Sequence, residues 1–251
     1  MGMVVPTPEP PTPEPSRPEP PATRRSKGFV VAMAGLVGAI SVLVVSLLTI
    51  DVHRNTGFAR DDSLVLRHVR YHSSSWLVDG AQALVRLGNV KTLVAVAIVV
   101  GLLLRWLGLR LILCAAPLAS LLVAGSLVAI MKATIGRSGP LEQLRFGVSD
   151  RGSFPSGHSA DTMSLAIALA IVLVAVLVRR PTERVIVFGF ALAFSAAVGM
   201  STLVLGVHWP TDVVAGWAVG LGAAVCVATL AVLATNDRPL AAARVQPRHR
   251  A

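Results

Sequence analysis

The feature that most constrains this chain is a series of apolar segments, most of them long enough to cross a lipid bilayer. A helix rises about 1.5 Å per residue, so about 20 apolar residues span the roughly 30 Å hydrocarbon layer. Six such runs follow one another, at about 28–50, 90–106, 111–131, 160–178, 185–205 and 213–234. A soluble chain of 251 residues would not need so many separate apolar runs. The sequence therefore predicts an all-α, polytopic membrane protein built as a bundle of six transmembrane helices.

Basic residues lie in short clusters between these runs, at 24–27, 105–110, 179–184 and 238–250. With six crossings all the clusters fall on one side of the membrane, which the positive-inside rule assigns to the cytoplasm, together with both termini. The connection at 51–89 also carries five arginines, but long loops are translocated with less regard to charge. The net charge of +10 thus reflects topology, and the clusters form no basic face with interleaved aromatic residues for nucleic acid.

Two tails and one long connection complete the predicted organisation. Residues 1–27 are rich in Pro, Glu and Thr, so we expect a disordered cytoplasmic tail, whose Pro-x-Pro repeats could alternatively bind a partner domain. Residues 28–234 form the membrane domain, and 235–251 form a basic cytoplasmic tail. The first apolar run is too long for a typical signal-peptide core, so we expect it to be retained. Within 51–89, helical spacing predicts an interfacial or re-entrant helix from Trp76, Leu77, Ala81, Leu84 and Leu87.

The spacing of cysteine and histidine gives no support to a disulfide framework or a metal centre. Cys114 and Cys226 each lie inside an apolar run without a Cys-x-x-Cys partner, and we expect both to be packing residues. Two histidines and an aspartate could bind zinc, but the chain has no tight His-x-x-x-His or His-Glu-x-x-His pair. We therefore expect no metal and no cofactor.

Three polar patches lie at the outer ends of the predicted spans, where a charged group is costly to bury and usually has a function. They are Lys132 with Arg137, the run PSGH at 155–158, and His208 with Asp212. The predicted topology brings the loops 132–158 and 201–212 together on the outer face of the membrane. This common location makes a shared site the natural interpretation.

Each patch suits the binding or transfer of an anion. The turn before the fourth apolar run lets the amides near Ser156 and Gly157, and the positive end of the helix, converge on an anion. His208 and Asp212 are four residues apart, so the carboxylate can orient the imidazole as a nucleophile or general base. A single interfacial histidine is more often a cap or a solvated residue, and we assign such roles to His53, His68, His72 and His249.

At these residues the chain resembles the type 2 phosphatidic acid phosphatase family, which shares its phosphate site with vanadium haloperoxidases. The family signature is Lys, six residues and Arg-Pro, then Pro-Ser-Gly-His, then Ser-Arg, five residues, His, three residues and Asp. Here the parts read KATIGRSGP at 132–140, PSGH at 155–158 and STLVLGVHWPTD at 201–212. The resemblance covers roughly 28–234 and implies the family's six-helix membrane bundle.

The resemblance also implies roles for individual side chains. His208 would attack phosphorus to form a phosphohistidine, with Asp212 orienting it and His158 protonating the leaving alcohol. The phosphoryl oxygens would be held by Lys132 and by the amides of Ser156 and Gly157.

Two arginines of the signature are absent from this chain. Gly139 occupies the position of the first, and Thr202 occupies the position of the second. In the family both bind phosphate, and losing one preorganised contact of this kind typically costs ~3–4 kcal/mol of transition-state stabilisation. We hypothesise that Arg137 or Arg151 reaches into the vacated space, and that Thr202 still donates one hydrogen bond.

The expected function is a metal-independent hydrolase that removes phosphate or pyrophosphate from a membrane lipid at the outer leaflet. The two missing arginines suggest an alternative from another class, a phosphatase-like membrane protein that binds a lipid phosphate or a partner without turnover. A phosphotransferase would use the same residues. A haloperoxidase is less consistent with six membrane spans, because its substrates are small and soluble.

Overall fold

The computed structural model describes residues 21–140 and 152–235, with side chains from Lys27 onward. This part of the chain contains eight helices and no strands. They are α1 (Pro21–Arg54), α2 (Gly57–Tyr71), α3 (Ser75–Leu87), α4 (Val90–Trp106), α5 (Leu111–Ile135), α6 (Gly157–Val176), α7 (Pro181–Val204) and α8 (Pro210–Ala234). The all-α prediction is confirmed, although α1 begins within the segment predicted as a disordered tail.

Five of the six predicted spans correspond to single helices, and the run 90–106 is one half of a bent pair of helices. Five helices are individually long and apolar enough to cross a bilayer: α1 from Lys27, α5, α6, α7 and α8. The helices α3 and α4 meet the same criteria only as a pair, and this pair is bent by 53°. The protein is therefore a multi-pass membrane protein, with five individual spans among the described residues and a sixth if the bent pair counts as one span.

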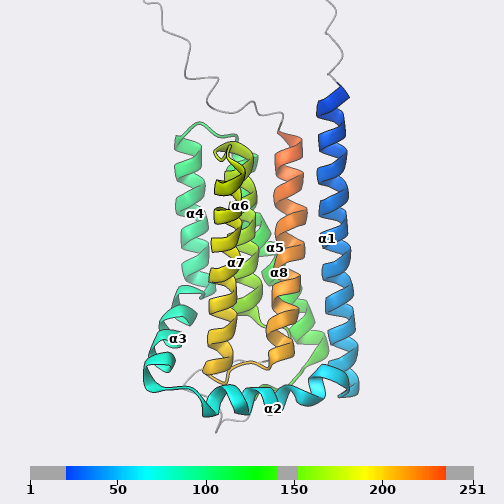
Figure 1. Cartoon of the computed structure of the whole chain (residues 1–251), viewed down its shortest axis with the longest axis vertical. Coiled ribbons are helices and arrows are strands. Elements are labelled where there is room, and N and C mark those ends of the chain that lie inside the picture. Colours follow the sequence, from blue (N-terminus) through cyan, green and yellow to red (C-terminus); the bar gives the residue numbers. More distant parts are fainter. Residues whose placement is uncertain (1–20, 141–151, 236–251) are drawn as a thin grey trace, which may run out of the picture.

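The helices stand side by side, with α8 in contact with α1, α5 and α6 (Figure 1). Glycines allow α6 and α8 to approach closely. A Cβ on Gly216 would lie 2.5 Å from the Ser156 carbonyl oxygen, and one on Gly220 would lie 2.2 Å from that of Ala160. Small residues permit such backbone contact between membrane helices. This contact fixes the start of α8 against the start of α6.

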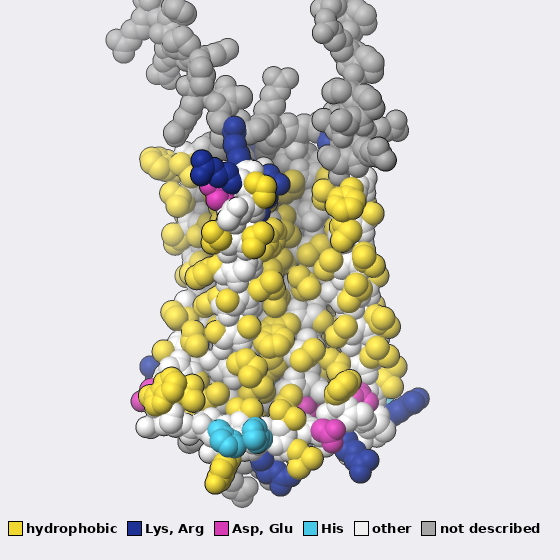
Figure 2. All heavy atoms as spheres, viewed as in Figure 1, with side chains coloured by type: hydrophobic (Ala, Val, Ile, Leu, Met, Phe, Trp, Pro, Cys, Tyr) yellow, Lys and Arg dark blue, Asp and Glu magenta, His cyan; other side chains and the backbone are white. Residues whose placement is uncertain are grey.

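The sides of the bundle are apolar and its ends are charged. On the face shown in Figure 2, hydrophobic side chains cover the middle, whereas basic and acidic side chains gather towards the two ends and histidines lie at the lower end. Helix α1 is the most lipid-facing span, because only 6% of its most apolar window is buried. This distribution is the one expected for a protein whose sides are solvated by lipid tails.

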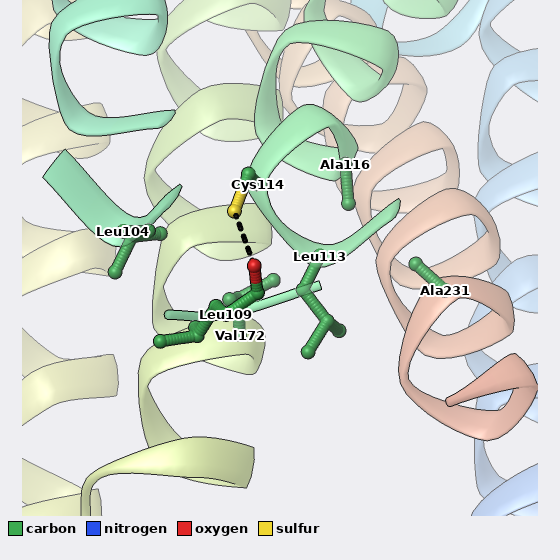
Figure 3. Packing of buried hydrophobic residues seen from close by; sticks show 7 residues of the cluster. All are labelled: Leu104, Leu109, Leu113, Cys114, Ala116, Val172 and Ala231. Carbon is green, nitrogen blue, oxygen red and sulfur yellow. Dashed lines mark hydrogen bonds between the residues drawn. The ribbon is translucent and has the colours of Figure 1, made fainter. Parts of the chain in front are cut away.

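A hydrophobic cluster closes the end of the bundle where α4 turns into α5 (Figure 3). It contains Leu104, Leu109, Leu113, Cys114, Ala116, Val172 and Ala231. The Cys114 thiol lies 3.7 Å from the Leu109 carbonyl oxygen and donates to it. Cys114 is thus a packing residue as predicted, but the same prediction for Cys226 is wrong, since that side chain is exposed on α8.

The connection 51–89 forms two helices, where the sequence predicted one. The predicted apolar spacing lies in α3, whose buried residues are Ala81 and Val85. Helix α2 crosses one end of the bundle (Figure 1). The Asp51 carboxylate holds its start by accepting from the Phe58 amide at 2.7 Å and the Thr56 hydroxyl at 2.9 Å. The helix is amphipathic, and it turns Ala59, Asp62 and Leu66 inward.

Candidate functional site

All three predicted polar patches lie at the end of the bundle that α2 crosses. Lys132 is in the last turn of α5, and Arg137 follows the left-handed Gly136 (φ 61°) that ends this helix. The PSGH run starts α6, and Asp212 is in the first turn of α8. A backbone hydrogen bond joins the start of α6 to the start of α8. The Ser156 amide donates to the Asp212 carbonyl oxygen at 2.9 Å.

Ser156 is the N-cap of α6. Its hydroxyl oxygen accepts from the Ser159 amide at 3.4 Å, and its side chain is fully buried. Because its own amide donates to Asp212, that amide is not directed at an anion, contrary to the role we expected for it. The next amides belong to the first turn of α6, where helix geometry provides no partners. Of the two amides predicted to hold an anion, only that of Gly157 belongs to this first turn.

His158 lies in the first turn of α6 and is half-buried. Its carbonyl oxygen accepts from the Thr162 hydroxyl at 2.6 Å. The other predicted histidine, His208, lies in the turn between α7 and α8 and is completely buried. Its Nδ1 is 3.6 Å from Oδ2 of Asp212. The structure thus places the imidazole of His208 beside the carboxylate predicted to orient it.

Both oxygens of the buried Asp212 carboxylate have partners. Oδ2 accepts from the Trp209 amide at 2.9 Å and from the Ser153 hydroxyl, in addition to facing His208. Oδ1 accepts from Nη1 of Arg137 at 2.5 Å. Asp212 is therefore held on one side by the start of its own helix and on the other by a guanidinium group.

Arg137 bridges two carboxylates. Its Nη1 contacts Asp212 Oδ1, and its Nη2 donates to Oδ2 of Asp62 at 2.6 Å. The same Nη1 donates to the Thr211 hydroxyl at 2.8 Å, and the guanidinium carbon lies 5.6 Å from the centroid of the Trp209 ring. The side chain is only 14% exposed. In this structure the charge of Arg137 is directed at protein carboxylates.

Asp62 is the residue of this network that sequence reasoning missed. It lies on the buried side of α2, and its Oδ1 accepts from the Thr211 amide at 3.0 Å. Burial raises the pKa of its carboxyl above the ordinary value, and the hydrogen bonds from Thr211 and Arg137 oppose this shift. The sequence does contain a pattern that points to Asp62. This aspartate lies at helical spacing from Ala59 and Leu66, on the apolar face of an amphipathic helix, where a charged residue is unusual.

The remaining predicted phosphate ligands have different surroundings. Lys132 is half-buried, and Gly152 lies against its side chain, since a Cβ there would be 3.4 Å from Lys132 Cβ. The Thr202 hydroxyl donates to the Gly199 carbonyl oxygen of its own helix at 2.6 Å and is fully buried, so our hypothesis that it donates to phosphate is wrong for this conformation. Arg151 lies outside the described residues.

Within the described residues, no group of three or more His, Cys, Asp or Glu side chains is arranged to hold a metal ion. A further carboxylate, Asp161, is buried one turn beyond His158. Its Oδ1 has no hydrogen-bond partner among the described residues.

Two apolar grooves lead away from this end of the bundle. One has a volume of about 380 Å³ and runs between α4, α6 and α7, from Thr162 through Ala166 to Phe190 and Leu173. The other, about 780 Å³, lies between α1, α2 and α8, and carries Asp51, Asp61 and Asp62 at its polar end. Only the first is free of charged side chains along its lining.

Comparison with known proteins agrees with this architecture. The sequence profile of the PAP2 superfamily matches residues 113–237. The chain is similar to the crystal structure of a transmembrane PAP2-type phosphatidylglycerolphosphate phosphatase from Bacillus subtilis, with a TM-score of 0.74 and 22% identity, covering 80% of this chain and 98% of that chain. For LpxE from Aquifex aeolicus the TM-score is 0.49, with 21% identity, covering 65% and 92%. None of the curated proteins matches the chain.

Proposed function

Because this chain belongs to the PAP2 superfamily, we propose that it removes phosphate or pyrophosphate from a membrane lipid, such as phosphatidate or a polyprenyl diphosphate. The observation that carries this proposal is the buried pair of His208 and Asp212, joined through a backbone hydrogen bond to the start of α6. A nucleophilic imidazole with an orienting carboxylate, next to the amides of a helix start, suits phosphoryl transfer without a metal.

In the proposed reaction His208 is the nucleophile. Its Nδ1 faces Asp212, so Nε2 forms the bond to phosphorus while the bond from phosphorus to the lipid oxygen breaks. His158 gives its proton to the departing oxygen. A water molecule then loses a proton to His158 and attacks phosphorus, and the phosphorus–nitrogen bond breaks to release phosphate.

The phosphoryl oxygens are held, in this proposal, by Lys132 and the Gly157 amide at the start of α6. Arg151, which precedes the described segment containing Ser153, is the remaining arginine that we propose as a phosphate ligand. Arg137 is a weaker proposal for this role, because it would have to leave two buried carboxylates to reach phosphate.

The groove between α4, α6 and α7 supports a lipid substrate. It starts at Thr162, whose hydroxyl contacts the carbonyl group of His158, and continues along the membrane-spanning parts of the helices. Its lining is apolar, as needed for an acyl or prenyl chain. We propose that the phosphate lies at the helix ends and the tail lies in this groove.

We also propose that the site faces the outer leaflet. The basic clusters at 105–110 and 179–184 lie at the opposite end of the bundle from His208, and basic residues favour the cytoplasmic side. Both termini would then be cytoplasmic.

One observation favours a second function, binding of a lipid phosphate without turnover. Both signature arginines are absent, and Thr202, which stands in place of one of them, donates within its own helix. A phosphotransferase that passes phosphate to an alcohol would use the same residues and differ only in the acceptor.

The direct test is phosphate release by purified protein in detergent, screened over lipid phosphates with a chelator present. We expect the wild-type protein to release phosphate. His208→Ala should lower the rate by at least about a thousandfold, as is usual when one member of a group of cooperating catalytic residues is removed. His68→Ala, a substitution on the exposed part of α2, is the matched control and should leave the rate unchanged. Activity that survives His208→Ala, or that disappears with the chelator, would contradict the proposal.

A further inference from the structure

We propose that Asp62 is a positioning residue for the nucleophile, acting through Arg137 and Asp212; this inference rests on the proposed function. The chain Asp62, Arg137, Asp212 and His208 connects α2 to the phosphoryl-transfer site through contacts of 2.6, 2.5 and 3.6 Å. None of the signature motifs contains Asp62. It belongs to the connection between the first two spans.

The first step is that Asp62 holds the start of α8. Its Oδ1 accepts from the Thr211 amide at 3.0 Å, and its Oδ2 accepts from the Thr211 hydroxyl at 2.5 Å. An acceptor at the first turn of a helix satisfies an amide that has no partner within the helix. Thr211 precedes Asp212 directly, so this contact also fixes the backbone that carries the orienting carboxylate.

The second step is that Asp62 fixes the direction of the guanidinium group. The two terminal nitrogens of Arg137 bind different carboxylates, Nη1 to Asp212 and Nη2 to Asp62. Because guanidinium is planar, anchoring one nitrogen sets where the other points. Without Asp62, Arg137 would keep its contact with Asp212 but lose the one that sets its orientation.

The third step is that Arg137 determines which oxygen of Asp212 faces His208. Oδ1 is occupied by Arg137, and Oδ2 accepts from the Trp209 amide and lies near His208 Nδ1. A rotation of the carboxylate would break the contact with Arg137. Asp62 therefore acts on the nucleophile from two sides, through the helix backbone and through the arginine.

This arrangement makes a prediction that a phosphate-binding role for Arg137 does not make. A positioning network changes the rate of the chemical step, whereas a phosphate ligand also changes affinity for the anion. Misplacement of a reacting group by about 1 Å can cost on the order of a hundredfold in rate. We thus expect Asp62→Asn to lower kcat about tenfold or more, with little change in KM or in the inhibition constant of vanadate, a phosphate analogue.

The experiment measures kcat, KM and vanadate inhibition for Asp62→Asn, Arg137→Lys and the double variant, with melting in detergent as the check of folding. A lysine has one ammonium group in place of the rigid two-nitrogen fork, so Arg137→Lys removes the fixed orientation of the bridge. It provides the second measurement if Asp62→Asn does not fold. The double variant should be no slower than the slower single variant, because both act through one network. Asp61→Asn, the same change at the exposed neighbouring residue, should match the wild type.

The results separate this inference from the proposed function. Independent, multiplying effects of the two substitutions would overturn the positioning role, as would a raised KM with unchanged kcat or a fully active Asp62→Asn. A folded wild-type protein that releases no phosphate from any lipid would overturn the proposed function itself, and the inference with it.

Discussion

Arg137 lies between two buried carboxylates, and this makes its positive charge part of the protein's own ion-pair network. Its position in the sequence suggested a substitute for the missing signature arginine two residues later, at Gly139. Side-chain partners depend on the elements that surround a residue. Here those are α2 and α8, which are distant from Arg137 in sequence.

Removal of this arginine should destabilise the protein. Arg137→Ala would leave Asp62 and Asp212 close together, buried and without their shared counter-ion. Breaking a buried ion pair from one side costs about 3–5 kcal/mol. We expect a loss of this order in the free energy of unfolding in detergent, whereas Arg67→Ala, on the exposed part of α2, should change it by less than about 0.5 kcal/mol. Equal stability of the two variants would contradict the role assigned to Arg137.

At the scale of single helices, the close contact of α6 and α8 brings the parts of the site together. The two helix starts contribute His158 and Asp212, and the glycines at 216 and 220 let their backbones meet. The same contact explains why the Ser156 amide can reach the Asp212 carbonyl oxygen.

A methyl group at this contact should separate the two helices. Gly220→Ala places a Cβ 2.2 Å from a backbone oxygen, which cannot move without shifting α6. We expect a lower melting temperature and a loss of phosphate release. Gly189→Ala, where nothing lies within 4 Å of the new Cβ, is the control and should melt at or slightly above the wild-type temperature. A Gly220→Ala protein with wild-type melting and activity would show that the contact is not required.

The groove between α4, α6 and α7 gives a second prediction at this scale. Ala166→Trp would fill part of its lining and should reduce turnover of long-chain lipid phosphates much more than that of short-chain ones. Leu47→Trp changes the groove between α1, α2 and α8, and should affect neither class. Equal losses for short and long chains after Ala166→Trp would argue against a tail site there.

For the molecule as a whole, hydrophobicity predicts the membrane spans well, because each helix must present apolar residues to lipid over a fixed length. The apolar runs were enough to predict the all-α class and where the chain crosses the membrane. The spacing of the three motifs predicted which residues lie at the helix ends. The separation of α3 from α4 was also predicted, but the helix α2 was not. A short amphipathic helix depends on the surface against which it packs, and that surface forms only when the bundle does.

The same reason explains the site residues that sequence reasoning missed or misassigned. Asp62 joins the site only because α2 folds across the end of α8. The hydroxyl of Thr202 could be assigned only once its carbonyl partner on α7 was known. Local spacing could predict the pairing of His208 and Asp212 because both residues lie within about one turn.

Membrane orientation is testable on the intact cell. In a background with Cys114 and Cys226 replaced by alanine, Ser138→Cys next to the site should react with a membrane-impermeant maleimide added outside. Thr182→Cys, at the start of α7 on the opposite end, should react only after permeabilisation. The reverse pattern would place the site on the cytoplasmic side.

The most direct test of the account is the identity of the group that carries the phosphate during turnover. Purified protein is mixed with a lipid phosphate labelled in the phosphoryl group, quenched within milliseconds under conditions that preserve phosphohistidine, and mapped by peptide mass spectrometry. We expect an acid-labile phosphate on His208 that is absent from His208→Ala. Phosphate release with the label on another residue, or with no labelled protein at any quench time, would contradict the central role of His208.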